Sequence, residues 1–491
     1  MKLREVLQDI PLVHLSGSGE EEIKSIAYSS GRVTPGSLFA ALRGGKRDGL
    51  DFVGEALKKG AAAVLADRPK PPEFSGVWVQ VQDGRQALAL SAANFYGRPS
   101  RKLTVVGVTG TKGKTTVTHL LESILQEAGF RPGLIGTISY RGPGFSSEAE
   151  RTTPEAPDIQ LLLRRMLEAG ASHCLLEVSS HALDLKRVWG VEFDVAIFTN
   201  LSGEHLDYHA SMEEYFEAKK KLFFLNSKKR TAVVNMDDPY GRKLLEELPL
   251  KTISFGCNPA AIVRASHYFF DQDGLRLTAE YPGGRAELSS PLMGRHNLYN
   301  ILAALAAGLA LNIPLASILS GIARLGHVPG RMEKVDNDQG LLVFVDYAHT
   351  DSALRHLLET ARSLTSSRVI LVFGAGGDRD RSKRERMGVV AAELADWSFL
   401  TSDNPRSEDP AAILAEIEKG FHKKGRKTFT SVADRREAIV RALSFARKGD
   451  IVLVAGKGHE PYQIIKDQRL PFNDAEVIRE VLAHLKKADH G

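Results

Sequence analysis

The sequence predicts an α/β protein of three domains: a small N-terminal α/β domain, a central P-loop domain on a parallel sheet, as in ATPases, and a C-terminal Rossmann-like α/β domain. Three observations predict this fold class. The chain has 491 residues, too many for one compact core and enough for about three domains. From Leu103 onward, strand-like apolar runs alternate with helical stretches, which is typical of parallel sheets. A glycine-rich loop joins the first of these strands to the first helix.

Composition and charge exclude several classes of protein. Hydrophobic residues make up 43% of the chain and charged residues 25%, which excludes a disordered or fibrous chain. The net charge of +5 is small for this length, so we expect no nucleic-acid partner. The two cysteines, Cys174 and Cys257, exclude a disulfide scaffold and favour a reducing compartment. The most apolar long run, residues 301–311, is too short to cross a bilayer, and the N-terminus lacks a signal-peptide pattern. We therefore expect a cytoplasmic protein without a membrane span.

Breaks in the pattern give the domain boundaries 1–98, 99–327 and 328–491. The first domain contains short apolar runs interrupted by Gly and Pro, and it ends in a basic, turn-rich connector. The second is predicted to contain these elements: strands at 103–108, 174–178 and 195–198, and helices at about 114–128 and at 297–311. The third is predicted to contain strands at 341–345, 369–373, 398–401 and 451–455, separated by helices.

The sharpest local pattern is the loop after the strand at 103–108. Its backbone N–H groups and the following helix N-terminus can cradle phosphate oxygens. Lys114 would reach the β- and γ-phosphates, and Thr115 would offer a hydroxyl to Mg²⁺. The predicted ATP-binding residues of the loop are Gly110, Thr111, Lys112, Gly113, Lys114, Thr115 and Thr116. The alternative is an ordinary βα turn, because Val108 stands where the strict pattern has Gly.

Eight segments, in order, carry a resemblance to a known family. They are residues 110–116 (GTKGKTT), 177–183 (EVSSHAL), 199–209 (TNLSGEHLDYH), 328–333 (VPGRME), 346–350 (DYAHT), 376–380 (GGDRD), 403–406 (DNPR) and 456–460 (GKGHE). Together they resemble the Mur ligases, the ATP-dependent enzymes that build the peptide of bacterial peptidoglycan in the cytoplasm. The resemblance extends over nearly the whole chain.

The resemblance implies a peptide-bond-forming ligase that acts on UDP-N-acetylmuramoyl-L-alanyl-D-glutamate. ATP would phosphorylate the D-glutamyl carboxylate, and the amine of an incoming amino acid would attack the acyl phosphate. The same resemblance assigns UDP binding to the first domain, ATP binding to the second and amino-acid binding to the third. We expect a monomer.

Joining two anions requires positive charge at the reacting centre, which Mg²⁺ supplies in such sites. The resemblance implies four metal ligands: Thr115, Glu177, His205 and Lys219. Lys219 would bind CO₂ as a carbamate and so become an anion. Lys114, Glu177, His205 and Lys219 form the implied catalytic set. The alternatives are a strand-end carboxylate paired with a lysine, a solvated loop histidine, and a solvated basic face at residues 219–221.

Further contacts are implied by position in the motifs. For ATP they are Asn297, Asn300, Arg331 and Asp346. For the uridine nucleotide they are Ala27, Ser29, Gly45, Lys46 and Arg47. For the muramoyl peptide they are Thr152, Thr153, Ser179 and Arg187. The sequence departs from the family pattern near these contacts at Tyr28, Ser30, Arg151 and Leu185.

By resemblance, the segment Asp403, Asn404, Pro405 and Arg406 marks the members that add meso-diaminopimelate in place of L-lysine. Diaminopimelate carries a second amino-acid head, and an arginine can pair with its extra carboxylate. Arg379 would bind a carboxylate of the same substrate, Asp403 and Glu460 would accept from its ammonium, and Gly456 would contribute its backbone. The alternatives are an L-lysine-adding sister ligase, a folylpolyglutamate synthetase-like ligase and, from another class, a P-loop switch ATPase.

Overall fold

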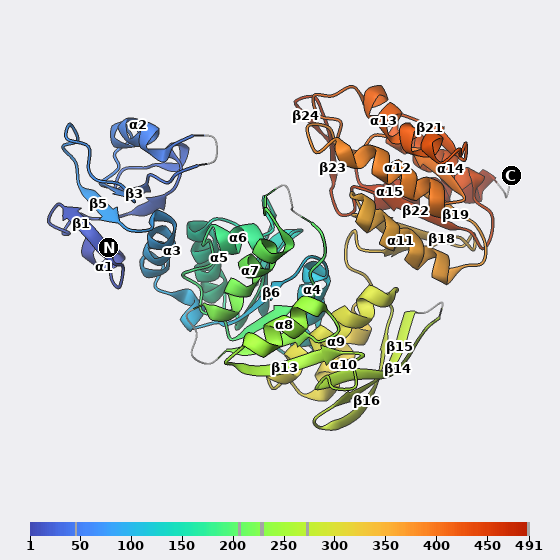
Figure 1. Ribbon diagram of the computed structural model, residues 1–491, viewed down its shortest axis with the longest axis horizontal. Helices are drawn as coiled ribbons and strands as arrows, with labels where there is room; N and C mark the ends of the chain where they lie inside the picture. Colours follow the sequence, from blue (N-terminus) through green and yellow to red (C-terminus); the bar gives the residue numbers. More distant parts are fainter. Residues whose placement is uncertain (45–46, 205–207, 226–229, 272–273, 489–491) are drawn as a thin grey trace. The chain divides into compact units, whose positions relative to one another are not determined.

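The computed structural model describes residues 1–44, 47–204, 208–225, 230–271 and 274–488. It divides into two compact units. The first comprises Met1–His267, Leu277–Leu288 and Leu298–Arg324, and the second Tyr268–Arg276, Ser289–Asn297 and Leu325–Gly491. The predicted α/β class is confirmed, because both units contain sheets flanked by helices (Figure 1). Within the described ranges, no helix combines the length and the apolar character needed to cross a bilayer.

The N-terminal part of the first unit is a small sheet of order β1-β5-β4-β3-β2. Its strands are β1 (Leu12–Ser16), β2 (Ser25–Ala27), β3 (Ser37–Ala40), β4 (Ala63–Ala66) and β5 (Trp78–Val81). Its α-helices are α1 (Leu3–Val6), α2 (Val53–Lys58) and α3 (Gly84–Phe95). Leu65 packs in one apolar cluster with Leu88 of α3, whereas Val64 packs in another with Ala56 of α2. Successive β4 side chains thus enter opposite cores, as expected for a strand buried on both faces.

The larger sheet has the order β16-β15-β14-β13-β12-β11-β6-β10-β7-β8-β9. Its first six strands along the chain are β6 (Thr104–Thr109), β7 (Pro132–Ile135), β8 (Ser139–Gly142), β9 (Phe145–Glu148), β10 (His173–Glu177) and β11 (Val195–Phe198). The others are β12 (Thr231–Asn235), β13 (Lys251–Gly256), β14 (Val263–Asp271), β15 (Gly274–Tyr281) and β16 (Gly284–Ser290). Val108 of β6 pairs with Glu177 on one side and Ile197 on the other, all in parallel. The loops that follow β6, β10 and β11 therefore meet at one edge, where open α/β sheets bind ligands.

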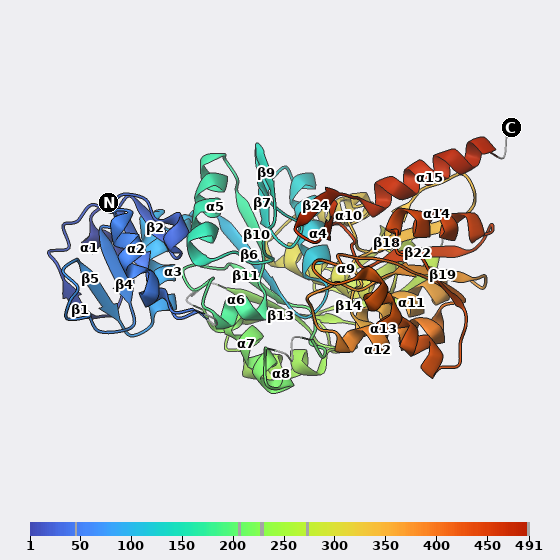
Figure 2. The ribbon, with the colours of Figure 1, turned by 90° about the horizontal axis from the view of Figure 1, so that it is seen from above.

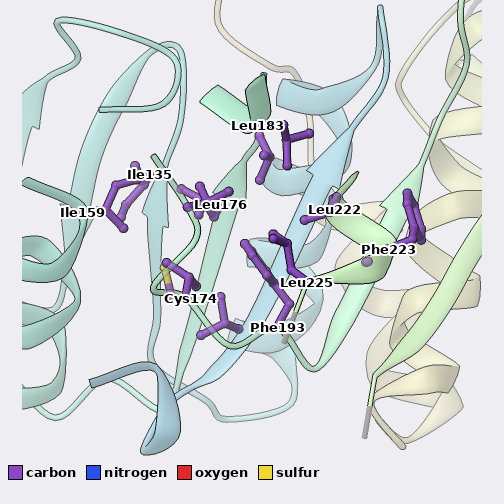
Figure 3. Close-up of a cluster of buried hydrophobic side chains, with 14 of the residues drawn as sticks. Ile135, Ile159, Cys174, Leu176, Leu183, Phe193, Leu222, Phe223 and Leu225 are labelled. Carbon is purple, nitrogen blue, oxygen red and sulfur yellow. The ribbon is translucent and has the colours of Figure 1, made fainter. Parts of the chain in front are cut away.

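Helices connect strands of this sheet: α4 (Lys114–Glu127), α5 (Ala156–Glu168), α6 (Ser180–Asp184), α7 (Met212–Phe224) and α8 (Pro239–Glu247). Helices α9 (Arg295–Ala310) and α10 (Leu315–Arg324) follow β16. Ile159 of α5, Leu176 of β10 and Leu222 of α7 belong to one apolar core (Figure 3). Phe193 lies so close to β6 that a Cβ at Gly107 would stand 2.7 Å from its ring. The apolar core thus fixes the strand that leads into the phosphate loop.

The predicted strands and helices of this region correspond to β6, α4, β10, β11 and α9. The strands β7, β8, β9, β12 and β13 were not predicted from the sequence, and neither were β14 to β16. In β16 exposed and buried residues alternate along the strand. That alternation is typical of a strand with one solvent-exposed face. Such a strand has no continuous run of apolar residues, which is the pattern that identified the buried parallel strands.

The second unit contains a sheet of order β17-β18-β22-β19-β20-β21. Its strands are β17 (Glu333–Val335), β18 (Leu342–Asp346), β19 (Val369–Phe373), β20 (Trp397–Leu400), β21 (Phe429–Ser431) and β22 (Ile451–Ala455), and a hairpin follows of β23 (Tyr462–Ile465) and β24 (Gln468–Pro471). The helices are α11 (Asp351–Leu364), α12 (Ser382–Leu394), α13 (Pro410–Lys423), α14 (Arg435–Phe445) and α15 (Asp474–Ala488). Helices α11, α12 and α13 cover one face, and α14 and α15 cover the other (Figure 2). Only β17 is antiparallel to its neighbour within this described sheet, so the loops after β18, β19, β20 and β22 share one edge.

Candidate active site

The phosphate loop, residues 109–116, is held by the segment after β11. The N–H of Thr111 donates to the Asn200 carbonyl at 2.9 Å, and the N–H of Lys112 donates to Asn200 Oδ1 at 2.9 Å. Gly110 has φ +144°, and an added Cβ would overlap the Thr199 hydroxyl. Gly113 has φ +88° and precedes α4 directly, with Asn300 against it. Both glycines are therefore required by close approach as well as by backbone conformation.

Glu177 is the buried carboxylate at the end of β10. Its Oε2 accepts hydrogen bonds from Thr115 Oγ1 at 3.0 Å and Thr137 Oγ1 at 2.9 Å. Its Oε1 accepts from the Thr137 N–H at 3.0 Å. The structure thus places the predicted metal ligands Thr115 and Glu177 side by side. Thr137 was missed, although its position directly after an apolar run and Gly136 is a signal that could have identified it.

Lys219 of α7 has a different environment from the two lysines that follow it in the sequence. Its side chain is buried, and Nζ donates to the Gly110 carbonyl at 2.8 Å, the same oxygen that Lys114 Nζ reaches at 2.9 Å. Burial, reinforced by the charge of Lys114, lowers the pKa of Lys219 well below its ordinary value. In contrast, Lys220 pairs with Glu217 and Glu247, and Lys221 pairs with Asp184 at the surface.

The segment after β11 places Glu204 and His209 at the same edge of the large sheet as the phosphate loop. The predicted ligand His205 lies outside the described residues. Lys112 forms an ion pair with Glu204. His209 is buried, its Nε2 lies 3.0 Å from Ser180 Oγ, and its ring stacks on Tyr215 with centroids 5.1 Å apart. In the described part of the chain, no three His, Cys, Asp or Glu side chains gather as a ready-made metal cluster.

The residues predicted to hold the muramoyl peptide lie beside Glu177. Thr153 Oγ1 donates to the Glu177 carbonyl at 2.8 Å and accepts from the Ser179 N–H at 3.0 Å. Arg187 Nη1 donates to the Thr153 carbonyl at 3.1 Å. Thr152 Oγ1 lies 3.1 Å from Thr137 Oγ1. This group is therefore continuous with the phosphate loop through the Glu177 strand end.

The predicted uridine contacts belong to the N-terminal sheet. Ala27 is buried at the end of β2, and Ser29 precedes a short 3₁₀ turn. Arg47 lies with its guanidinium 6.0 Å from the Phe52 ring centroid. Gly45 and Lys46 lie outside the described residues.

Tyr28, which departs from the family pattern, contacts the central part of the chain. Its hydroxyl donates to Asp158 of α5 at 2.6 Å, and Arg32 pairs with the same carboxylate at 2.7 Å.

The remaining ATP contacts are distributed over both units. Asn300 belongs to the first unit and lies against Gly113. Within the second unit, Asn297 donates to the Met293 carbonyl at 2.7 Å. The Asp346 carboxylate accepts from the Met332 and Ala348 N–H groups, both at 2.8 Å. The Arg331 guanidinium lies 5.1 Å from the Tyr347 ring centroid.

In the second unit, the three acceptor loops, residues 376–380, 403–408 and 456–460, meet at one sheet edge. A Cβ at Gly376 would lie 3.1 Å from Arg406 Nη1 and 3.8 Å from Arg379 Cγ, so both arginines flank this glycine. Arg406 has φ +52°, and its Nη1 donates to the Gly377 carbonyl at 2.7 Å. A Cβ at Gly456 would meet the Asp403 carboxylate, and one at Gly377 would overlap the Pro405 carbonyl. The predicted amino-acid-binding residues thus lie together.

A group of ion pairs centred on one buried arginine supports these loops and was missed from the sequence. Arg384 of α12 is fully buried and pairs with Glu408 at 2.8 Å and Glu416 at 2.9 Å. Asp378, with φ +53°, accepts from Ser407 Oγ at 2.6 Å. The hydrogen bond from Arg384 holds the pKa of Glu408 at about 2.

Three family models match the chain: the Mur ligase family catalytic domain at residues 22–96, the Mur ligase middle domain at 108–308, and the Mur ligase glutamate ligase domain at 330–458. The chain belongs to the Mur ligase family and is an ATP-dependent amino-acid ligase.

Named relatives point to one member of the family. The UDP-N-acetylmuramoyl-L-alanyl-D-glutamate–2,6-diaminopimelate ligase of Solibacter usitatus is 46% identical over 491 residues, covering 98% of each chain. The enzyme of that name from Geobacter metallireducens is 43% identical over the full length of both chains. A solved structure of a ligase with this name superposes with a TM-score of 0.72 at 31% identity, covering 99% of each chain. A Mycobacterium tuberculosis folylpolyglutamate synthase with ADP and AMPPCP shares the fold, with a TM-score of 0.62 at 18% identity over 74% of this chain and 91% of that one.

Proposed function

We propose that this chain adds meso-2,6-diaminopimelate to the D-glutamyl carboxylate of UDP-N-acetylmuramoyl-L-alanyl-D-glutamate, in cytoplasmic peptidoglycan precursor synthesis. One observation carries the choice of amino acid: Arg379 and Arg406 flank Gly376 at the edge where the acceptor loops meet. Two guanidinium groups suit the carboxylate that diaminopimelate has and L-lysine lacks. The names of the full-length relatives support the same choice.

The proposed division of labour follows the three predicted domains. Residues 1–98 bind the uridine nucleotide through Ala27, Ser29 and the segment that includes Gly45, Lys46 and Arg47. Residues 99–327 bind ATP and the muramoyl peptide, and residues 328–491 bind the amino acid. The protein acts as a monomer.

The residues present suit Mg²⁺. The Thr115 hydroxyl and the Glu177 carboxylate are hard oxygen donors that already lie 3.0 Å apart in a buried setting. With His205 and a carbamate on Lys219, they are the proposed metal ligands. When bound, the ion supplies positive charge between the phosphate and the attacking carboxylate.

Lys219 suits carbamate formation because only a neutral amine attacks CO₂. Burial and the charge of Lys114 lower the pKa of Lys219, which favours its neutral amine. The product is an anion beside the cation of Lys114. Carbamate formation releases one proton, and the anionic product is attracted to the Lys114 ammonium.

The chemistry takes two steps. The D-glutamyl carboxylate attacks the γ-phosphorus while the bond to ADP breaks, and the phosphate loop with Lys114 holds the phosphate oxygens. The amine of diaminopimelate, after losing a proton, then attacks the acyl carbon and phosphate leaves. Arg187, held beside Thr153 and Ser179, orients the carboxylate-bearing peptide near the loop.

A ligation assay tests the proposal. Purified protein is incubated with ATP, Mg²⁺ and the uridine dipeptide substrate, with either meso-diaminopimelate or L-lysine, and product and ADP are quantified. We expect ADP and tripeptide in equal amounts with diaminopimelate and little product with lysine. Product with lysine alone would replace the proposal by the sister ligase. ATP hydrolysis without any acceptor would favour a switch ATPase.

A further inference from the structure

Lys457 is a buried cation that the mechanism above does not use. It follows β22 in the acceptor loop 456–460, and its side chain has 0% exposure. A lysine is almost never fully buried unless its ammonium is paired. Its partners therefore indicate why it is there.

The ammonium of Lys457 contacts two acceptor-loop side chains. Nζ donates to Glu460 Oε2 at 3.2 Å and to Asn404 Oδ1 at 3.3 Å. The Tyr462 ring centroid lies 5.6 Å away on the following hairpin. Lys457 thus joins two loops that follow different strands, β20 and β22.

These contacts fix how the Asn404 amide is turned. Asn404 Oδ1 accepts from Lys457 and also from the Ile464 N–H at 2.8 Å. With the oxygen held by two donors, Nδ2 points to Glu460 and donates to Oε2 at 2.8 Å. Lys457 and Asn404 therefore converge on the same carboxylate oxygen, which leaves Oε1 as the oxygen to offer to a ligand.

We infer that Lys457 is a positioning residue for the acceptor amino acid: through Glu460 Oε2 and the Asn404 amide it turns Glu460 Oε1 toward the substrate ammonium. The inference rests on the proposed function, in which Glu460 binds that ammonium. The charge of the buried Lys457 ammonium strengthens its hydrogen bond to Glu460 Oε2 and so helps to fix the orientation of that carboxylate. Asn404 then acts through Glu460 and need not touch the substrate.

Steady-state kinetics of the full chain test this role. In Lys457→Met, Glu460 Oε2 loses one of its two side-chain hydrogen-bond donors and keeps Asn404 Nδ2. We expect the KM for diaminopimelate to rise by about tenfold or more, with the KM for ATP and for the uridine nucleotide within about twofold. Ile439→Ala, in the apolar core under α14, is the matched control. It lowers the melting temperature without a selective rise in any KM.

Two further variants separate the possible results. Lys457→Gln keeps a hydrogen-bond donor without the charge and is expected to give a smaller rise in the diaminopimelate KM. Glu460→Gln tests the proposed function itself. If it leaves that KM unchanged, the role of Glu460 is wrong. If it raises that KM and Lys457→Met does not, only the positioning role fails.

A double variant completes the test. Because Lys457 acts through Glu460, the two substitutions together should raise the diaminopimelate KM little more than Glu460→Gln alone. Additive effects would contradict the inference. Equal rises in all three KM values, or loss of a cooperative thermal transition in both Lys457 variants, would assign Lys457 to folding and overturn it.

Discussion

The phosphate loop and the acceptor loops are built in different ways. In the phosphate loop the geometry is made mainly by backbone: Gly110 and Gly113 permit close approach, and Asn200 holds two loop N–H groups. In the acceptor loops it is made by side chains, through the Arg384–Glu408 pair and the Lys457–Asn404–Glu460 group. All nucleoside triphosphates carry the same triphosphate group, so a phosphate site can be built mainly from backbone. An amino-acid site must distinguish between different side chains, which requires specific side-chain contacts.

This difference decides how substitutions act. A loop that binds through its backbone is expected to keep its function when side chains other than its glycines and Lys114 are changed. A side-chain network transmits a change at one position to the next, so substitutions without substrate contact alter specificity.

The largest effect is expected for Lys114→Met in the phosphate loop. In the proposed mechanism the Lys114 ammonium holds the transferred phosphate, so its loss should lower kcat by about a thousandfold, as for other groups that stabilise developing charge. Measured ADP release with all substrates saturating checks this. The exposed Lys102→Met is the control and should match the parent chain. A loss under tenfold in Lys114→Met would contradict the assigned role.

Next is Lys219→Met, expected to lower kcat by about a hundredfold because no carbamate can form. Lys220→Met and Lys221→Met are matched controls on the same helix, since their partners are Glu217, Glu247 and Asp184 away from the loop. ¹³C NMR with labelled bicarbonate should show a carbamate in the parent chain and both controls. A signal in Lys219→Met would reassign the modification.

Arg406→Lys should raise the diaminopimelate KM by about 10- to 50-fold, because a lysine keeps the charge but loses bidentate pairing. ATP affinity should stay unchanged. The exposed Arg426→Lys serves as the control. Equal discrimination between diaminopimelate and L-lysine before and after the change would remove Arg406 from the specificity site.

The smallest effect concerns acid stability. The pKa of Glu408 is lowered from an ordinary 4.5 to about 2 by Arg384, so the carboxylate contributes stability above pH 4.5. That contribution is lost as the pH falls through about 2. Glu408→Gln should therefore flatten the melting temperature profile in this window. Asp409→Asn, one residue on, is the control, and an unchanged profile in Glu408→Gln would exclude the network as a source of stability.

The two regions were also unequally predictable. The phosphate loop was identified from seven consecutive residues, because a backbone cradle needs Gly, Lys and Thr at fixed spacing. Among the three lysines at 219–221, the resemblance, the preceding Ala218 and the distance from His205 favour Lys219. The structure adds that Lys219 is buried and donates to the Gly110 carbonyl. The role of Lys219 and the roles of the other proposed site residues are predictions.

The residues that support the two regions through long-range contacts could not be predicted from the sequence. Arg384 is 24 residues from Glu408 along the chain, and Thr137 is 40 from Glu177. Contacts at such separation depend on how strands are ordered in a sheet, which local patterns do not determine. The α/β class needed only local patterns, and for that reason it was predictable.

The order of strands in the second unit also has a consequence for synthesis of the chain. β22 is the last strand made in the six-stranded sheet, yet it lies between β18 and β19 and hydrogen-bonds to both. A nascent chain on the ribosome therefore has a gap in the middle of this sheet until residue 455 has emerged. Gly456, Lys457 and Glu460 follow immediately, so the amino-acid site and its supporting sheet become complete almost at the same moment.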